Sequence, residues 1–197
     1  MKTAIIFIWL RESRVINAIE MTHALAGTDD LIIYTEKCDL RYSAAVNWNR
    51  AIDKVAPLCQ NICIMGDDCL PQKDWLKNAL AAMATLPGGW GMVNLNDGTG
   101  IDRTSHVVFD KRCLDLLDGK LLHEGYFFCC SDMEMMDRMR ESGHYIFAPD
   151  AIAVHYHPML FKDAPNDQFY DKAYSHEQRL ADRALYETRN LNGWKNE

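Results

Sequence analysis

Residues 61–71 read NICIMGDDCLP and are the most informative stretch of the chain. The four apolar residues 62–65 are typical of a strand buried on both faces, as strands of parallel sheets are. A glycine and two adjacent carboxylates, Asp67 and Asp68, follow this strand directly. Because ligands of open α/β sheets bind outside the carboxyl ends of the strands, the stretch predicts a site at this turn.

The two carboxylates of this turn have two interpretations. Adjacent carboxylates repel each other unless a cation or hydrogen-bond donors compensate them. Magnesium takes one or two carboxylates together with phosphate oxygens, so a divalent cation carrying a diphosphate fits Asp67 and Asp68. Asp and Gly are also common turn residues, and the pair could simply open the next turn. The residues alone favour neither interpretation, and nucleotidyltransferases and other magnesium-dependent phosphate enzymes share the pattern.

Short apolar runs alternate with helical patterns on both sides of this stretch. Further strands are predicted at residues 3–8, 31–34, 91–95 and 106–109, with two final strands at 145–148 and 151–155. Helices are predicted at residues 14–26, 43–55, 73–86, 111–117, 131–142 and 171–190. This alternation predicts an α/β fold with a mostly parallel central sheet and helices on both faces.

Length, charge and cysteine content favour some classes of protein and exclude others. A chain of 197 residues fits one domain, expected at 1–157, with a C-terminal helical and aromatic extension at 158–197. A net charge of -7 argues against a protein that coats nucleic acid through phosphate neutralisation. The longest apolar runs are too short for a transmembrane segment. Seven cysteines without a CxxC pair indicate free thiols and a cytoplasmic protein.

A second informative stretch, residues 129–141, reads CCSDMEMMDRMRE. Ser131 and Glu134 fit a capping box at the start of a helix, with Glu134 on its solvent face. At 100° per residue, Met135, Met136 and Met139 fall within about 60° of Asp132, which therefore lies in the apolar stripe. A carboxylate on the core side is costly unless it lines a cleft, and such a carboxylate has the character of a general base.

Histidines offer a third signal near the end of the predicted sheet. His155 ends the apolar run 151–155, and His157 points to the same side if the strand continues. Imidazole binds transition metals, although a single histidine at a strand end is usually only hydrogen-bonded. The remaining histidines have no spacing that indicates a site: His23, His106, His123, His144 and His176.

Taken together, these segments resemble the inverting glycosyltransferases of the GT-A fold known as family 2. The central block of that family is matched by residues 49–52 (NRAI), the apolar strand, Asp68, Pro71 and Trp75–Leu76. Asp68 corresponds to the last Asp of the Asp-x-Asp metal motif, and Gly66 stands where the first is expected. Residues 131–143 look like the Glu-Asp block, and residues 149–155 are similar to the late strand whose final histidine reaches the metal.

The resemblance implies a role for each of these residues. Asp132 is the implied catalytic base, and Asp68 and His155 are the implied ligands of Mn²⁺ or Mg²⁺. Glu36 stands in for the carboxylate with which the family binds the nucleoside. The other implied donor contacts are Trp9, Arg11, Asn49, Arg50 and Asp67.

The expected activity is metal-dependent transfer of a sugar, with inversion, from a nucleoside diphosphate sugar to an acceptor hydroxyl. The acceptor stays open among a saccharide, a protein, a small molecule and a modified DNA base. One alternative is a nucleotidyltransferase acting on a sugar phosphate, against which the N-terminal part offers no glycine-rich phosphate loop. Another is a non-catalytic module that binds nucleotide sugars. The aromatic side chains of the extension would cover an acceptor site, form a dimer contact or belong to a partly ordered end. They are Phe161, Phe169, Tyr170, Tyr174 and Trp194.

Overall fold

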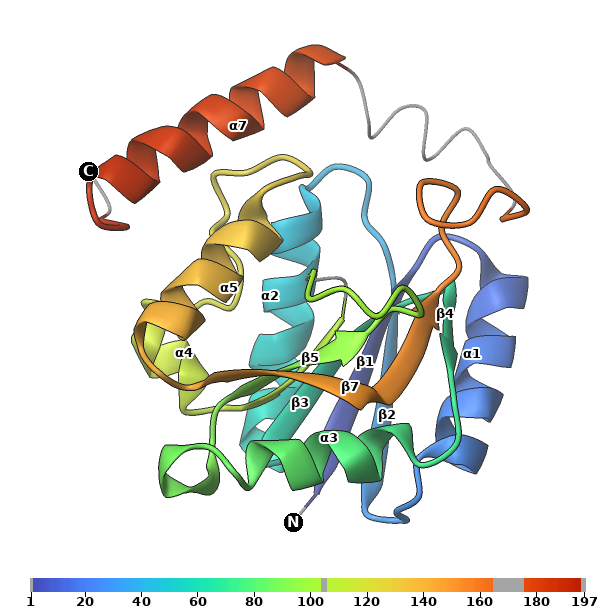
Figure 1. The fold of residues 1–197 in the computed structure, drawn as a ribbon. Coiled ribbons are helices and arrows are strands. Elements are labelled where there is room, and N and C mark those ends of the chain that lie inside the picture. The colour runs from blue at the N-terminus through green and yellow to red at the C-terminus, as the bar shows by residue number, and fades with distance from the viewer. Residues whose placement is uncertain (1, 104–105, 165–175, 196–197) are drawn as a thin grey trace.

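The computed structural model describes residues 2–103, 106–164 and 176–195, and within these ranges the chain forms one curved sheet flanked by helices (Figure 1). The strands are β1 (Thr3–Trp9), β2 (Leu31–Lys37), β3 (Asn61–Gly66), β4 (Cys69–Pro71), β5 (Met92–Asn96), β6 (Val107–Asp110) and β7 (Tyr145–His155). The helices are α1 (Glu12–Leu25), α2 (Ala44–Val55), α3 (Trp75–Met83), α4 (Cys113–Leu116), α5 (Ser131–Glu141) and α7 (His176–Leu191). Two short 3-10 turns lie at Ala56–Leu58 and Pro87–Gly89.

The strand order of the described sheet is β2-β1-β3-β6-β5-β7-β4. Strand β1 is parallel to β2 and β3, and β5 is parallel to β7. Strand β6 is antiparallel to β3 and β5, and β4 is antiparallel to β7. Strands β1, β2, β3, β5 and β7 therefore run in one direction, which confirms the predicted mostly parallel sheet. The ends of β3 and β7 consequently meet at one edge.

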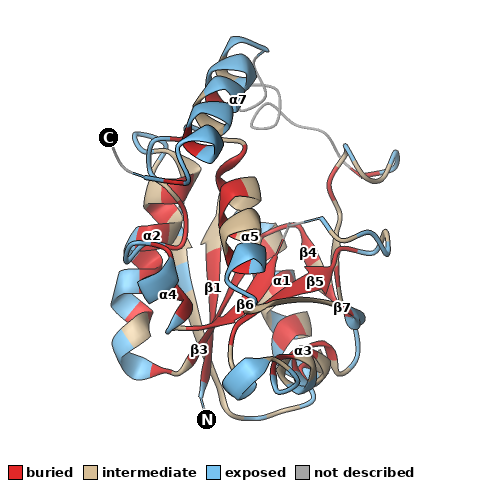
Figure 2. Cartoon of the chain, turned by 60° about the vertical axis from the view of Figure 1, so that its left-hand side comes forward, coloured by how far each residue is buried: buried red, intermediate tan, exposed pale blue. Residues whose placement is uncertain are grey.

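Both faces of the sheet are covered by helices, as predicted. On one face the core combines Ile62 and Ile64 of β3 with side chains of α2 and α5. On the other face Cys63 and Met65 pack with side chains of α1 and α3. The apolar run of β3 is therefore buried on both sides, and β1, β3, β5 and β6 stand out as buried in Figure 2. Fully burying one such large apolar side chain stabilises the fold by roughly 1.5–3 kcal/mol.

The sequence predicts the N-terminal cap of one helix correctly and that of another wrongly. Ser43 caps α2, its Oγ accepting the backbone N–H of Val46 at 3.3 Å, as the pattern of residues 43–55 predicts. At α5 the predicted capping box is wrong. The helix begins after Cys130, whose φ of 70° is left-handed, and no side-chain cap bond forms there. Glu134 is 2% exposed and faces α7 instead of solvent.

The last part of the sheet differs from the prediction in two ways. The two final strands are a single strand, β7, with an irregularity where its partner β5 passes from Leu95 to Asn96. The Asn96 side chain donates to the Pro149 carbonyl at 2.9 Å, which holds the proline within the strand. The three-residue strand β4 was not predicted. Its pairing of Cys69 with His155 brings the acidic turn to the end of β7.

The C-terminal helix α7 lies across α5 (Figure 1). It begins at His176, and the start of the predicted helix at 171–175 lies outside the described residues, as do Phe169, Tyr170 and Tyr174 of the predicted aromatic tail. No helix in the described ranges has the length and apolar character needed to cross a membrane. All seven cysteines are free thiols, as expected.

Candidate active site and metal centre

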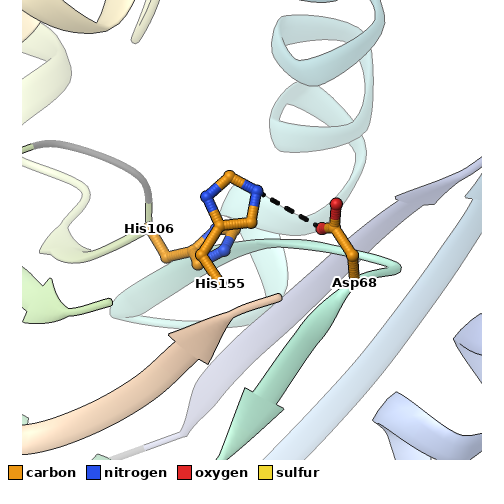
Figure 3. Close-up of side chains that lie close together, drawn as sticks. All are labelled: Asp68, His106 and His155. Carbon is orange, nitrogen blue, oxygen red and sulfur yellow. Dashed lines mark ion pairs between the residues drawn. The ribbon is translucent and has the colours of Figure 1, made fainter. Parts of the chain in front are cut away.

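Three side chains with metal-binding chemistry meet where β3, β6 and β7 come together (Figure 3). They are Asp68, His106 and His155, whose ligand atoms all lie within 4.8 Å of one another. The Nε2 atom of His155 lies 3.5 Å from Oδ1 of Asp68. The sequence predicted two of the three, and the structure adds His106.

The sheet register explains why these residues meet. Ile64 of β3 pairs with Val107 of β6, so His106 enters β6 beside the end of β3. The Tyr156 N–H donates to the Asp68 carbonyl at 2.9 Å, which continues the pairing of β4 with β7 and fixes His155 at the acidic turn. His106 was missed because sequence spacing does not show that β6 lies next to β3.

Gly66 makes room for the Asp68 carboxylate. A Cβ atom at position 66 would lie 2.6 Å from Oδ1 of Asp68 and 3.6 Å from Cε1 of His106. The first distance is far inside van der Waals contact, so any side chain at position 66 would displace the carboxylate. Gly66, which stands where the first Asp of the expected motif would be, therefore leaves the space that the Asp68 carboxylate occupies.

The buried imidazole of His106 has the electronic state of a metal ligand. His106 is 5% exposed, and its burial, assisted by the nearby His155, lowers its pKa to about 3 against the opposing effect of Asp68. His106 is therefore neutral at physiological pH and keeps a lone pair for coordination. Within the described part of the chain, buried Nε2 of His106 and buried Nδ1 of His155 have no hydrogen-bond partner. Such atoms are rare in native proteins, and a bound ion is one of their explanations.

Asp67 turns away from this cluster. Its Oδ2 atom accepts the backbone N–H groups of Leu10 and Arg11 at 2.9 and 2.8 Å, and its Oδ1 atom lies 3.0 Å from Nη2 of Arg11. These bonds tie the acidic turn to the segment between β1 and α1. The contact of Asp67 with the donor or the metal stays a prediction.

Asp132 lies in the first turn of α5, half-buried, on the same helix side as the buried Met135 and Met139. Burial raises its pKa above the usual 3.8, although the Met133 N–H at 3.0 Å and the nearby His155 favour its charged form. The role of Asp132 as the catalytic base stays a prediction. A carboxylate with a raised pKa accepts protons more readily than an ordinary aspartate, as a general base must.

The predicted nucleoside contacts Glu36 and Arg50 lie close to each other. The Glu36 carboxylate accepts hydrogen bonds from Lys54 Nζ and from the Tyr34 hydroxyl, both at 2.6 Å. Burial raises the pKa of Glu36, but these two bonds and the charges of Lys54 and Arg50 outweigh it and leave the pKa lowered. The Arg50 guanidinium lies 5.0 Å from the ring of Tyr42.

The remaining predicted contacts are placed differently. Asn49 is 1% exposed, and its side chain donates to the Leu122 carbonyl at 2.7 Å and to Glu124 at 3.0 Å, so it fixes the loop before α5. Trp9 ends β1 and has Lys37 Nζ 5.7 Å from its ring centroid. Roles of Trp9 and Asn49 in donor binding stay predictions.

No protein-family model and no curated protein sequence matches the chain. Solved structures do match its fold. The catalytic domain of Drosophila β1,4-galactosyltransferase 7, in complex with xylobiose, has a TM-score of 0.60 and 14% identity, covering 88% of this chain and 79% of that chain. A mutant of that enzyme with manganese, UDP-Gal and xylobiose has a TM-score of 0.59 and 12% identity, covering 89% and 80%.

The mannosyltransferase PcManGT of Pyrobaculum calidifontis, with GDP-Man and Mn²⁺, has a TM-score of 0.65 and 13% identity. The match covers 99% of this chain and 64% of the mannosyltransferase, which is less than two thirds of its length. Likeness at such low identity is evidence for the fold alone. The chain therefore has the GT-A fold that the three sequence segments predicted.

Proposed function

We propose that this chain is a metal-dependent glycosyltransferase that moves a sugar from a nucleoside diphosphate sugar to an acceptor hydroxyl, with inversion. The observation that carries the proposal is the cluster of Asp68, His106 and His155 at the strand ends of a GT-A fold. Manganese and nucleotide sugars in two of the similar structures support it.

The cluster suits a divalent cation, for which Mn²⁺ is the first choice and Mg²⁺ the second. One carboxylate and two imidazoles offer an oxygen and two nitrogens, and imidazole suits transition metals better than it suits magnesium. The buried Nε2 of His106, which has no hydrogen-bond partner among the described residues, fits this assignment. When bound, such a cation supplies Lewis acidity that stabilises the negative charge of a departing diphosphate.

Asp132 then acts as the general base. Its carboxylate takes the proton of the acceptor hydroxyl while the acceptor oxygen bonds to the anomeric carbon. The bond from that carbon to the diphosphate breaks, and its electron pair leaves with the diphosphate. Partial burial at the start of α5 keeps the base away from bulk water and raises its proton affinity.

The donor would lie across the ends of β1 and β2. Asp67 anchors the segment that carries Trp9 and Arg11, and we assign these residues to the diphosphate side. Glu36 and Arg50 are assigned to the nucleoside, and Asn49 supports the loop in front of α5. The acceptor stays open among a saccharide, a protein, a small molecule and a modified DNA base.

The test is a thermal-shift panel of UDP-, GDP-, TDP- and CMP-sugars with and without Mn²⁺. A ligand at 100 times its dissociation constant stabilises the fold by about 2.7 kcal/mol, which is readily measured. We expect one nucleotide class to stabilise the chain only with Mn²⁺, and Asp68→Ala to abolish the shift. Asp29→Ala removes an exposed carboxylate just before β2, at the opposite sheet edge, and should change nothing.

The base is tested on the donor that the panel identifies. Asp132→Asn keeps the size of the side chain and removes its basicity, so donor binding should survive while transfer is lost. Undiminished transfer by this variant would contradict the base assignment. A chain that responds to none of the four nucleotide classes would contradict the glycosyltransferase proposal itself.

A further inference from the structure

A single carboxylate on α7 holds the loop in front of α5. Asp182 accepts three consecutive backbone N–H groups, from Phe127 at 2.9 Å, Phe128 at 2.9 Å and Cys129 at 2.8 Å. The acceptor is 2% exposed and lies more than fifty positions away in sequence. Hydrogen bonds to an ionised acceptor are about twice as strong as neutral ones, so this is a strong clamp on residues 127–129.

The clamp belongs to a larger contact between α7 and α5. Arg189 donates to both oxygens of Glu134, from Nε at 2.7 Å and from Nη2 at 2.8 Å. Further along, the Tyr186 hydroxyl donates to Asp137. These bonds fall on the side of α5 away from the predicted base, because Glu134 and Asp137 lie about 200° and 140° round the helix from Asp132.

The backbone at the start of α5 needs such support. Cys130 has a φ of 70°, a left-handed conformation that is unfavourable for a residue with a side chain. Such a conformation persists where the surrounding structure holds it in place. The three clamped residues precede Cys130 directly, and Asp132 follows two positions later.

We infer that Asp182 is a positioning residue: by fixing residues 127–129 it sets the backbone at the start of α5 and so the direction of the Asp132 carboxylate. Its effect on turnover rests on the proposed function, whereas the clamp itself does not. Helix α7 thereby positions the proposed base, although it contributes no reacting group.

The experiment compares Asp182→Asn with Glu187→Gln in the full chain. The asparagine keeps the size of the side chain but loses the charge that two oxygens share among three donors. Glu187 lies on the same helix, is 60% exposed and pairs with Arg183, so its replacement is a matched charge loss outside the clamp. Hydrogen exchange is read at residues 127–129 and, for global stability, at β3.

In Asp182→Asn we expect exchange at residues 127–129 to become about tenfold or more faster, with β3 unchanged. Glu187→Gln should match the wild type at both places. With the donor found in the thermal-shift panel, Asp182→Asn should lower kcat at least several-fold while KM for the donor stays the same. If the role of Asp182 were purely structural, its replacement would not lower kcat selectively while KM stayed the same.

Unchanged exchange at residues 127–129 in Asp182→Asn would overturn the clamp, and faster exchange with unchanged kcat would overturn the positioning role. If the wild type turned over no donor, the proposed function would fail, while exchange would still decide on the clamp. If Asp182→Asn does not fold, the test is instead hydrogen exchange of the wild-type chain at increasing urea concentrations. The amides of 127–129 should then open together with those of α7, and separate opening would overturn the inference.

Discussion

His106 is the residue whose replacement best separates a metal site from an ordinary buried histidine. The change to test is His106→Leu, which keeps the volume roughly similar and removes both ring nitrogens. A buried polar atom without a partner costs about 1–3 kcal/mol, and Nε2 of His106 is such an atom. The edge contact with the ring of His155, at 4.7 Å between centroids, is worth about 0.5–1.5 kcal/mol. Without metal, the variant should therefore lie between about 0.5 kcal/mol less stable and about 2.5 kcal/mol more stable than the wild type.

Metal should favour the wild type. With Mn²⁺ at 100 times its dissociation constant, the wild type should gain about 2.7 kcal/mol, equivalent to roughly 5–10 °C in Tm for a domain of this size. His106→Leu loses one of the three protein ligands of the cluster, so the same Mn²⁺ concentration should give it little stabilisation. Urea unfolding and thermal melts, each with Mn²⁺ or with a chelator, measure both effects in one series.

His144→Leu is the control. The His144 ring stacks on Trp90 at 3.8 Å, and its Nδ1 atom contacts the Trp90 carbonyl at 3.1 Å, so this histidine has partners and lies outside the cluster. Its loss should lower stability and leave the response to Mn²⁺ intact. The reasoning is refuted if His106→Leu is several kcal/mol less stable without metal and still shows the wild-type response to Mn²⁺. His106 would then be a structural core residue.

Two further predictions concern the ion pair between α5 and α7. Arg189→Met leaves the buried Glu134 carboxylate without its main partner, and urea unfolding should show a loss of about 3–5 kcal/mol in unfolding free energy. Adding Glu134→Gln to the same chain should restore most of this loss. A loss below about 1 kcal/mol would mean that the pair behaves as an exposed one. Burial raises the pKa of Glu134, but hydrogen bonds from Arg189 and Tyr126 outweigh this effect and leave the pKa below 4.5. The stability that the ionised Glu134 provides is therefore present above pH 4.5 and is lost as the pH falls through the folded-state pKa. As the pH falls below 4.5, the wild type should therefore lose more unfolding free energy than the double variant, and parallel stability curves would show that the pair does not titrate as the structure implies.

Features that depend on neighbouring residues in the sequence could be predicted. The run of four apolar residues in β3 gave a strand buried on both faces, and Ser43 gave the start of α2. The direction of Asp132 followed from helical periodicity, because Met135 and Met139 of the same stripe are buried. Each of these signals is contained within one element, where backbone geometry alone relates the side chains.

Features that depend on pairing between distant segments could not be predicted in this way. β4 is too short to show a pattern, and its place is fixed only by its partner β7. Glu134 has the spacing of an exposed capping residue, and its burial depends on Arg189, 55 positions later. His106 needs the neighbourhood of β6 and β3, which the order of strands in the sequence does not give.

The cluster combines one carboxylate with two imidazoles. A side chain at position 66 would collide with the Asp68 carboxylate where it lies here. Asp67 is bound to the backbone of Leu10 and Arg11, so the turn offers one carboxylate to the cluster. Imidazoles from β6 and β7 complete the set, which replaces hard oxygen ligands by nitrogen. Because magnesium strongly prefers oxygen and imidazole suits transition metals, this replacement favours Mn²⁺ over Mg²⁺ in the proposed site.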